Sequence, residues 1–291
     1  MVFNCIIVRC GEIFLKGRNR GVFERALHTN IVAKTTQHLQ SKLQGRFILP
    51  YFADYDQLRL VFGLTSYSPA LKTTKTITAI QVAALSLLSQ KSGYFKVAAS
   101  RADKTFLHLS PEINRLVGEY IEQHTALQFK LHHPEITLGI EINRDGAYLF
   151  LEKIPGRGGL PVGVEGTIGL LLEDEASILA GLLMMKRGCD ICLITLHQPK
   201  QAALLQQFSP KPLPSTTVAD FKQLEHYARQ EDLTTLVSGQ HFGTYGPYQT
   251  NLVTLRPLIA YTWERIAREL EEFNSLSASH THPRLLLLKQ P

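Results

Sequence analysis

The stretch GTIGLLLEDEASILAGLLMMKRG, residues 166–188, decides the fold of the C-terminal half of this chain. An apolar run at 168–172 is followed by a short polar turn and then by an apolar-periodic segment that ends before Gly188. This pattern predicts a strand, a tight turn and a helix. In α/β folds such a turn often binds a phosphate, because the helix N-terminus offers free N–H groups and the positive end of its dipole.

The turn itself has the wrong chemistry for that task. Glycine allows the backbone to approach an anion, and fixed negative charge repels the anion. Here the turn is Glu173, Asp174 and Glu175, with three acids and no glycine. Acids at a helix start are favourable for the dipole on their own. The sequence therefore predicts a nucleotide-binding scaffold whose phosphate site is degenerate.

The segments around this turn closely resemble the tRNA 4-thiouridine sulfurtransferases, a family often called ThiI and also known for thiamine biosynthesis. The matching stretches are IVRCGEIFLKGRNR (7–20), FGLTSYSPA (62–70), FKVAASRADK (95–104), LSPEINR (109–115), LEKIPGRGGLPVG (151–163), AGLLMMKRG (180–188), LVSGQHFG (236–243) and LRPLIAY (255–261). The resemblance implies a ferredoxin-like domain, a THUMP RNA-binding domain and an ATP-pyrophosphatase (PP-loop) domain in series.

We therefore predict an α/β protein with an α+β N-terminal part. The expected divisions are a ferredoxin-like domain at 1–63, a THUMP domain at 64–154, a Gly/Pro linker at 155–165 and a reduced, Rossmann-like parallel sheet at 166–291. Within them we expect helices at 22–43, 76–88, 110–125, 218–229 and 263–273. Expected strands include 2–9, 47–52, 58–62, 95–99, 135–143, 147–152 and 189–196.

The chain departs from the family at the residues that carry its chemistry. The family's PP-loop reads Ser-Gly-Gly-x-Asp-Ser, whereas residues 173–177 are one residue shorter and keep only Ser177. The family's catalytic cysteine follows the segment matching 256–259, and this sequence has no cysteine after Cys192. We therefore expect no catalytic residue, no metal and no cofactor.

The expected function is tRNA binding by a non-catalytic member of the family that presents tRNA for thiolation. One alternative is an active, ATP-dependent tRNA uridine sulfurtransferase that holds ATP with Mg²⁺ through other residues and takes its thiol from a partner. Another is a small-ligand binder at the altered sheet edge.

The excess of positive charge lies entirely in residues 1–165. Residues 1–165 carry 20 Lys and Arg against 13 Asp and Glu, a net charge of +7, whereas residues 166–291 carry 11 against 12, a net of −1. A basic half favours a polyanion such as RNA, although a solvated basic surface has the same composition. The predicted RNA-binding residues are Arg9, Lys16, Arg18, Arg20, Lys96, Arg101, Lys104, Arg115 and Arg157. Phe106 and His108 could stack on bases or pack in the core.

Other motifs give weaker indications. Cys189 and Cys192 have the spacing of a metal or redox pair, but three residues apart on a strand they point to opposite faces. His280 and His282 lie in a polar tail. The loop at 239–246 could bind a base or RNA, or be remnant scaffold. Expected partners are the tRNA acceptor region and a separate catalytic PP-loop or sulfur-carrier protein; a homodimer is left open. With no long apolar run and few cysteines, we expect no membrane association and a cytoplasmic location.

Overall fold

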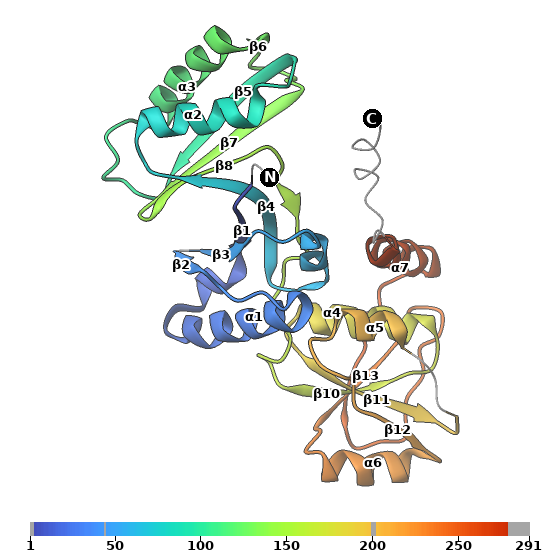
Figure 1. The fold of residues 1–291 in the computed structure, drawn as a ribbon. Coiled ribbons are helices and arrows are strands. Elements are labelled where there is room, and N and C mark those ends of the chain that lie inside the picture. The colour runs from blue at the N-terminus through green and yellow to red at the C-terminus, as the bar shows by residue number, and fades with distance from the viewer. Residues whose placement is uncertain (1–2, 44, 199–201, 279–291) are drawn as a thin grey trace, which may run out of the picture. The chain divides into compact units, whose positions relative to one another are not determined.

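The computed structural model describes residues 3–43, 45–198 and 202–278. These residues form two compact units (Figure 1). The first unit contains the residues up to Gly11, Gln37–Tyr55 and Leu64–Gly156. The second contains Glu12–Thr36, Asp56–Gly63 and the residues from Arg157 onward.

The first unit is built on a mixed sheet. Its strands are β1 (Cys5–Cys10), β2 (Ser41–Leu43), β3 (Arg46–Pro50), β4 (Leu64–Thr73), β5 (Gly93–Arg101), β6 (Leu127–Phe129), β7 (Ile136–Asn143), β8 (Gly146–Phe150) and β9 (Ile154–Pro155). The strand order is β2-β3-β1-β4-β8-β7-β5-β6, with β9 beside β4. β5 pairs in parallel with β6 and β7, and the other pairings are antiparallel. The long strand β4 thus connects the N-terminal strands to the β5–β8 region.

Two helices cover one face of the β5–β8 region, α2 (Ile77–Leu88) and α3 (Ser110–His124) (Figure 1). Their buried faces pack on the sheet in one core that includes Ile80, Leu88, Ile113, Val117 and Ile121. The Thr76 hydroxyl caps α2 by accepting from the N–H of Ala79. Helix formation here follows from apolar residues at helical spacing and from a side chain that satisfies an N-terminal N–H.

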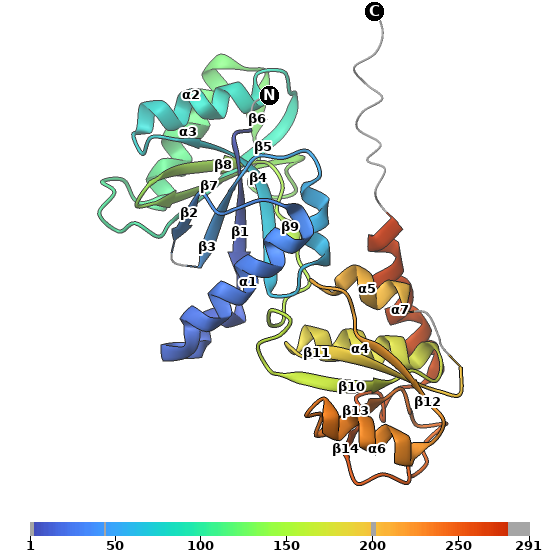
Figure 2. The same ribbon diagram turned by 60° about the horizontal axis from the view of Figure 1, so that its bottom comes forward.

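The second unit contains a parallel sheet between two helical layers (Figures 1 and 2). Its strands are β10 (Thr167–Leu171), β11 (Asp190–Leu196), β12 (Ser215–Val218), β13 (Thr235–Ser238) and β14 (Val253–Leu255), in the order β12-β11-β10-β13-β14. All four pairings are parallel. Helices α4 (Glu175–Lys186), α5 (Ala203–Phe208) and α7 (Trp263–Ala278) share one core, and α6 (Phe221–Gln230) packs in another. This is the doubly wound arrangement of Rossmann-like folds.

The second unit also contains η1 (Glu12–Asn19), α1 (Arg20–Thr35) and most of η2 (Tyr55–Leu60). Asn30 Nδ2 on α1 donates to the carbonyl of Val162, 3.1 Å away. The N–H of Gly63 donates to the carbonyl of Gly158, at 2.8 Å. The segment around 158–162 is therefore fixed by residues from the N-terminal part of the chain. These contacts do not test the domain boundaries predicted from the sequence at 63, 154 and 165, and those boundaries stay a prediction.

The α/β class and the reduced parallel sheet expected from the sequence are confirmed. Two element predictions were wrong. The helix expected at 22–43 ends at Thr35, because Thr36 adopts a left-handed conformation with φ of 58° and the chain turns into β2. The strand expected at 58–62 is instead part of η2, since a short apolar run is buried equally well in either conformation.

Candidate functional site

The candidate site lies at the point in the parallel sheet where the strand order reverses, between β10 and β13. β10 is paired on one side with β11 and on the other with β13, so the loops after β10 and β13 leave the same edge of the sheet in neighbouring positions. In open α/β sheets the ligand crevice forms at this point, outside the carboxyl ends of the strands. The residues after β10 are Glu173, Asp174 and Glu175, the acidic turn predicted from the sequence.

The acidic turn caps helix α4 with its own side chains. Asp174 is the N-cap, and its Oδ1 accepts from the N–H of Ser177 at 3.1 Å. In return Ser177 Oγ accepts from the N–H of Glu173 at 3.1 Å and from that of Asp174 at 3.4 Å. Three backbone N–H groups of the turn are thus satisfied internally. In a phosphate-binding loop such groups point at the anion.

Glu173 is held by a residue from a distant part of the sequence. The hydroxyl of Tyr248 donates a short hydrogen bond to Glu173 Oε2. Burial raises the pKa of Tyr248, and the hydrogen bond to Glu173 and its charge raise it further. The phenol is therefore the donor of this hydrogen bond, and the carboxylate of Glu173 is its acceptor.

The loop after β13 packs closely against the first turn of α4, which follows β10. A Cβ built on Gly239, the residue after β13, would lie 2.3 Å from the N atom of Ser177 and 2.7 Å from the carbonyl carbon of Ala176. Ser177 and Ser238 are fully buried. Only a glycine allows the β13 loop to approach the first turn of α4 this closely. The loop after β13 and the first turn of α4 are thus in close approach.

Two of the predicted RNA-binding arginines are bound by other residues of their own units. Arg9 is 3% exposed, and its Nε lies 2.6 Å from Glu141 Oε1. Burial lowers the pKa of Arg9, and Glu141 opposes that shift. Arg157 donates to the carbonyl of Glu272 at 2.7 Å, and its guanidinium stacks 4.3 Å from the Phe273 ring centroid. Arg9 therefore stabilises the sheet of the first unit, and Arg157 fixes helix α7.

The remaining basic residues differ in their surroundings. Arg18 and Lys104 are exposed, Lys96 is half-buried, and the side chain of Lys16 lies outside the described residues. Arg20 pairs with Glu24, Arg101 donates to the carbonyl of Phe106, and Arg115 pairs with Glu119.

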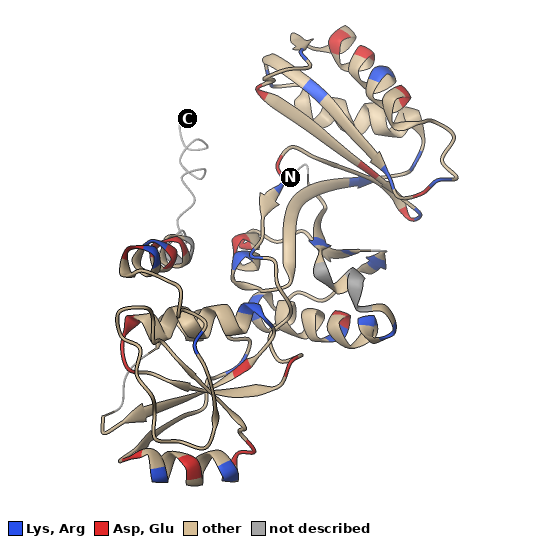
Figure 3. Ribbon diagram, turned by 180° about the vertical axis from the view of Figure 1, so that it is seen from behind, with Lys and Arg blue, Asp and Glu red and all other residues tan. Residues whose placement is uncertain are grey.

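Within the first unit, the predicted basic residues that the structure describes do not share one face. Lys96 and Arg101 are five residues apart on β5 and so face opposite sides of the sheet. Arg115 is accompanied on α3 by three glutamates (Figure 3). Phe106 packs against the core formed by α2, α3 and the β5–β8 region, and His108 pairs with Glu112.

Cys189 and Cys192 behave as the spacing predicts. Cys189 belongs to the core beneath α4 and Cys192 to the core beneath α6, on opposite faces of the sheet. Burial raises the pKa of both thiols. Among the described residues, no three His, Cys, Asp or Glu side chains are grouped as metal ligands. His280 and His282 lie outside the described residues.

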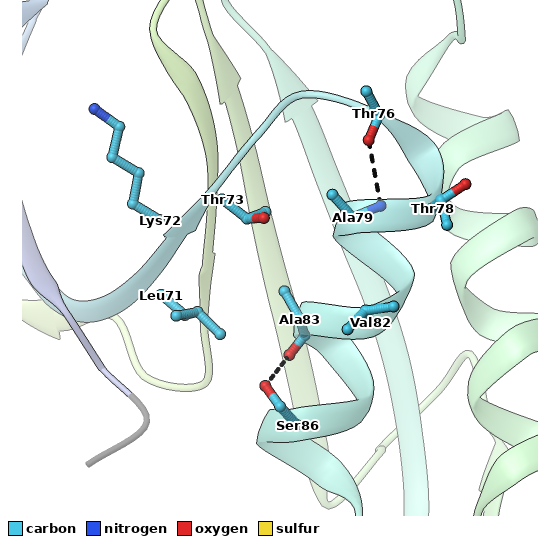
Figure 4. A pocket seen from close by; sticks show the side chains of 9 residues that line it. All are labelled: Leu71, Lys72, Thr73, Thr76, Thr78, Ala79, Val82, Ala83 and Ser86. Atoms are coloured by element: carbon cyan, nitrogen blue, oxygen red, sulfur yellow. Dashed lines mark hydrogen bonds between the residues drawn. The ribbon is translucent and has the colours of Figure 1, made fainter.

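A surface hollow of about 500 Å³ lies in the first unit, whereas the acidic turn belongs to the second. It is lined by Leu71, Lys72, Thr73, Thr76, Thr78, Ala79, Val82, Ala83 and Ser86 (Figure 4). Its polar groups are engaged nearby: Ser86 Oγ donates to the carbonyl of Ala83, and Lys72 Nζ pairs with Asp145 at 2.8 Å. The floor is mainly apolar, which does not favour phosphate binding.

Sequence reasoning missed several residues that shape the site. Tyr248 and Arg256 are separated from the acidic turn by more than 70 residues, and no local motif places them beside it. Glu141 was missed as well, although it binds both Arg9 and Arg46. A charged residue within an otherwise apolar strand was the available signal for Glu141.

Two family models match most of the N-terminal half of the chain. Residues 5–68 match the ThiI ferredoxin-like domain, and residues 75–152 match the THUMP domain. This chain belongs to the ThiI-type family. The predicted resemblance is therefore confirmed for the N-terminal half by independent domain models.

Curated relatives extend the match beyond these domains. A probable tRNA sulfurtransferase from Natranaerobius thermophilus is 37% identical over 216 residues, which is 67% of this chain and 52% of the relative. One from Moorella thermoacetica is 38% identical over 207 residues, 67% of this chain and 53% of the relative. The chain thus matches about half the length of these relatives.

Two solved structures resemble the whole described fold. PH1313 from Pyrococcus horikoshii Ot3 has a TM-score of 0.80 and 28% identity, and the match covers 93% of this chain and 99% of that one. A 4-thiouridine synthetase–RNA complex with bound ATP has a TM-score of 0.79 and 25% identity, covering 94% and 86%. Within the described residues, no helix is both long and apolar enough to cross a lipid bilayer.

Proposed function

We propose that this chain binds tRNA through residues 1–165 and does not adenylate it, presenting the tRNA to a separate catalytic chain for thiolation. The observation that carries the proposal is the self-capped acidic turn. Asp174 and Ser177 satisfy three N–H groups of the turn, those of Glu173, Asp174 and Ser177, which are therefore not free to bind a phosphate. Glu173 and Glu175 add negative charge beside them.

The residues of the turn do not fit the phosphates of ATP. Adenylation requires positive groups or N–H donors that neutralise developing negative charge. The turn instead offers three carboxylates, and one of them is held in place by Tyr248. Gly239 lies against the first turn of α4, which leaves the backbone of the two loops in close approach. The acidic turn is therefore not expected to support adenylation by ATP.

The proposal for tRNA rests on the family and on charge. The THUMP match covers residues 75–152, and the solved relative named a 4-thiouridine synthetase was crystallised with RNA. The net charge of +7 in residues 1–165 supplies the attraction for a polyanion. Arg18, Lys96 and Lys104 are the basic candidates that we carry forward as phosphate-binding residues.

A second candidate is an active, ATP-dependent tRNA uridine sulfurtransferase that takes its thiol from a partner. The likeness to a 4-thiouridine synthetase with bound ATP favours it. In that case ATP with Mg²⁺ would be held by residues other than the acidic turn. The two candidates make opposite predictions for ATP binding.

Two titrations of the purified protein separate the candidates. Filter binding with unmodified tRNA should give saturable retention, and ATP with Mg²⁺ should leave the thermal midpoint unchanged because the turn repels phosphates. A ligand present at 100 times its dissociation constant stabilises a protein by about 2.7 kcal/mol, so binding would be evident. Stabilisation by ATP would reject the non-catalytic proposal, and failure to retain tRNA would reject its RNA-binding part.

A further inference from the structure

The loop that follows β5, residues 102–109, is exposed or half-buried except at one position. Lys104, Thr105 and Leu107 are exposed, whereas Asp103 is only 5% exposed. A carboxylate is rarely buried unless it is paired. The burial of one acid in a loop that otherwise faces solvent therefore calls for an explanation.

Asp103 binds a group on each side of its carboxylate. Its Oδ1 accepts from the N–H of Thr105 at 2.9 Å and from the hydroxyl of Thr105 at 2.6 Å. Its Oδ2 lies 2.5 Å from Nζ of Lys75, in the connection between β4 and α2. The hydrogen bonds from Lys75 and Thr105 hold the pKa of the Asp103 carboxyl below its usual range, so the group is ionised at neutral pH. The carboxylate thus ties the loop to a distant part of the chain.

Further hydrogen bonds close the loop on both sides of this anchor. The N–H groups of Ala102 and of the residue after it donate to the carbonyl of Ile142, at 2.9 Å and 3.1 Å. Nη1 of Arg101 donates to the carbonyl of Phe106 at 2.8 Å. The backbone before and after Lys104 is therefore held in place, while the side chain of Lys104 is exposed.

The charge of Asp103 is unfavourable for RNA. Asp103 precedes Lys104, one of the residues that the proposed function assigns to phosphate contacts, and a carboxylate there repels a polyanion. If charge alone matters, removal of Asp103 should strengthen RNA binding. If Asp103 holds the loop, its removal should weaken RNA binding, because a mobile loop loses conformational entropy when it binds, whereas a fixed loop has already lost it. The two roles predict effects of opposite sign.

We propose that Asp103 is a positioning residue for RNA binding, which holds the loop 102–109 so that Lys104 meets a phosphate with its backbone already fixed. This inference rests on the proposed tRNA-binding function. It assigns a contribution to tRNA affinity to a buried acid, which residue type and net charge would both exclude.

Filter binding of unmodified tRNA to the full chain tests this role in a double-mutant cycle with Lys104→Gln. Asp103→Ala removes the acceptor for Thr105 and the partner of Lys75. It should weaken tRNA binding about tenfold, as the loss of one charged contact does. The slope of log affinity against log salt should fall by about one. In the Lys104→Gln chain Asp103→Ala should cause no further loss, because the side chain that Asp103 positions is absent.

Thr105→Val gives the same test without a change of charge, and it applies even if Asp103→Ala does not fold. Thr105 is exposed, and valine keeps its shape while removing the hydroxyl that donates to Asp103. Thr105→Val should weaken tRNA binding about threefold, within the range for one hydrogen bond. In the Lys104→Gln chain it should have no effect.

Asp145→Ala is the matched control. Asp145 also pairs with a lysine of the first unit, Lys72, at 2.8 Å, and it lies in the turn between β7 and β8, which contains no predicted RNA-binding residue. This substitution removes the same charge as Asp103→Ala and likewise takes the partner from a lysine. The affinity for tRNA should not fall.

Unchanged or stronger tRNA binding by Asp103→Ala and Thr105→Val would overturn the inference, since Asp103 would then act by its charge or not at all. Equal losses in the unmodified and Lys104→Gln chains would also overturn it, because they would indicate a general effect on the fold. If Lys104→Gln binds tRNA as the unmodified chain does, the inference fails and the proposed function stands. If the unmodified chain retains no tRNA, the proposed function fails and the inference with it.

Discussion

At the scale of single residues, the acidic turn is explained by the partners of its oxygen-bearing side chains. Asp174 and Ser177 cap each other's backbone, and Tyr248 donates to Glu173. A capping exchange of this kind contributes about 1 kcal/mol to a helix. Two of the carboxylates that are unsuited to a phosphate, those of Glu173 and Asp174, thus have a structural role of their own.

Tyr248→Phe tests the hydrogen bond to Glu173. Loss of a bond to a charged group should lower the free energy of unfolding by about 1.5 kcal/mol. The pKa of Tyr248 is raised in the folded state, so its contribution is complete below about pH 10 and is lost as the pH rises above that value. Urea unfolding at pH 7 to 11 should show a difference between the proteins that shrinks above pH 10.

Tyr245→Phe is the control for this experiment, because Tyr245 is exposed on the same loop. Its stability should match that of the unmodified chain at each pH. Equal losses in both variants would mean that the bond to Glu173 has no special part in holding the turn.

At the scale of elements, the sequence predicted the helices and strands that a local pattern of apolar and polar residues marks. The strand expected at 189–196 and the helix expected to begin at Trp263 lie where predicted, since apolar residues and flanking polar residues mark them. The short strands β12 and β14 were missed, because three or four residues carry too little periodicity. The pairing of Tyr248 with Glu173 could not be predicted either, because it joins residues 75 positions apart.

The close approach of the β13 loop to α4 depends on Gly239. In Gly239→Ala the new methyl group would meet backbone atoms of Ala176 and Ser177, which cannot move as a flexible side chain can. Overpacking of this kind costs about 1–3 kcal/mol, and we expect a loss in that range by urea unfolding. At Gly246 the nearest atom to a new Cβ would be 3.9 Å away. Gly246→Ala should therefore change stability little, and equal losses would contradict the close approach.

Arg157 is expected to stabilise the C-terminal part of α7 rather than to bind RNA. Arg157→Ala removes the hydrogen bond to the carbonyl of Glu272 and the stacking on Phe273. Amide hydrogen exchange should become faster around residues 269–273, while retention of tRNA stays within about twofold, less than removal of a phosphate-binding side chain would cause. A large decrease in tRNA affinity with unchanged exchange would restore Arg157 as an RNA-binding residue.

At the scale of the whole molecule, the uneven charge predicts where RNA binding depends on salt. In the double variant Lys96→Gln/Lys104→Gln, the slope of log affinity against log salt should decrease by about two, one for each lysine that no longer binds a phosphate. Lys222 is an exposed lysine on α6, in the half with a net charge of −1. Lys222→Gln should leave the slope unchanged, and an equal change in both proteins would indicate only a general effect of net charge.

The family and the fold class could be predicted from the sequence because long matching stretches run along most of the chain. The RNA-binding residues could not be chosen by residue type alone. Arg9 and Lys104 look alike in the sequence, yet Arg9 is buried against Glu141 whereas Lys104 is exposed. Only the arrangement of strands in the sheet separates a structural arginine from a surface one.

The most direct test of the central claim is the release of pyrophosphate from ATP by the purified protein, with Mg²⁺ and saturating unmodified tRNA. The turn formed by Glu173, Asp174 and Glu175 is capped by its own side chains and repels phosphates. We therefore expect no release above that of a control in which ATP, Mg²⁺ and tRNA are incubated without the protein. Release that requires both the protein and tRNA would contradict it and would show that other residues hold ATP.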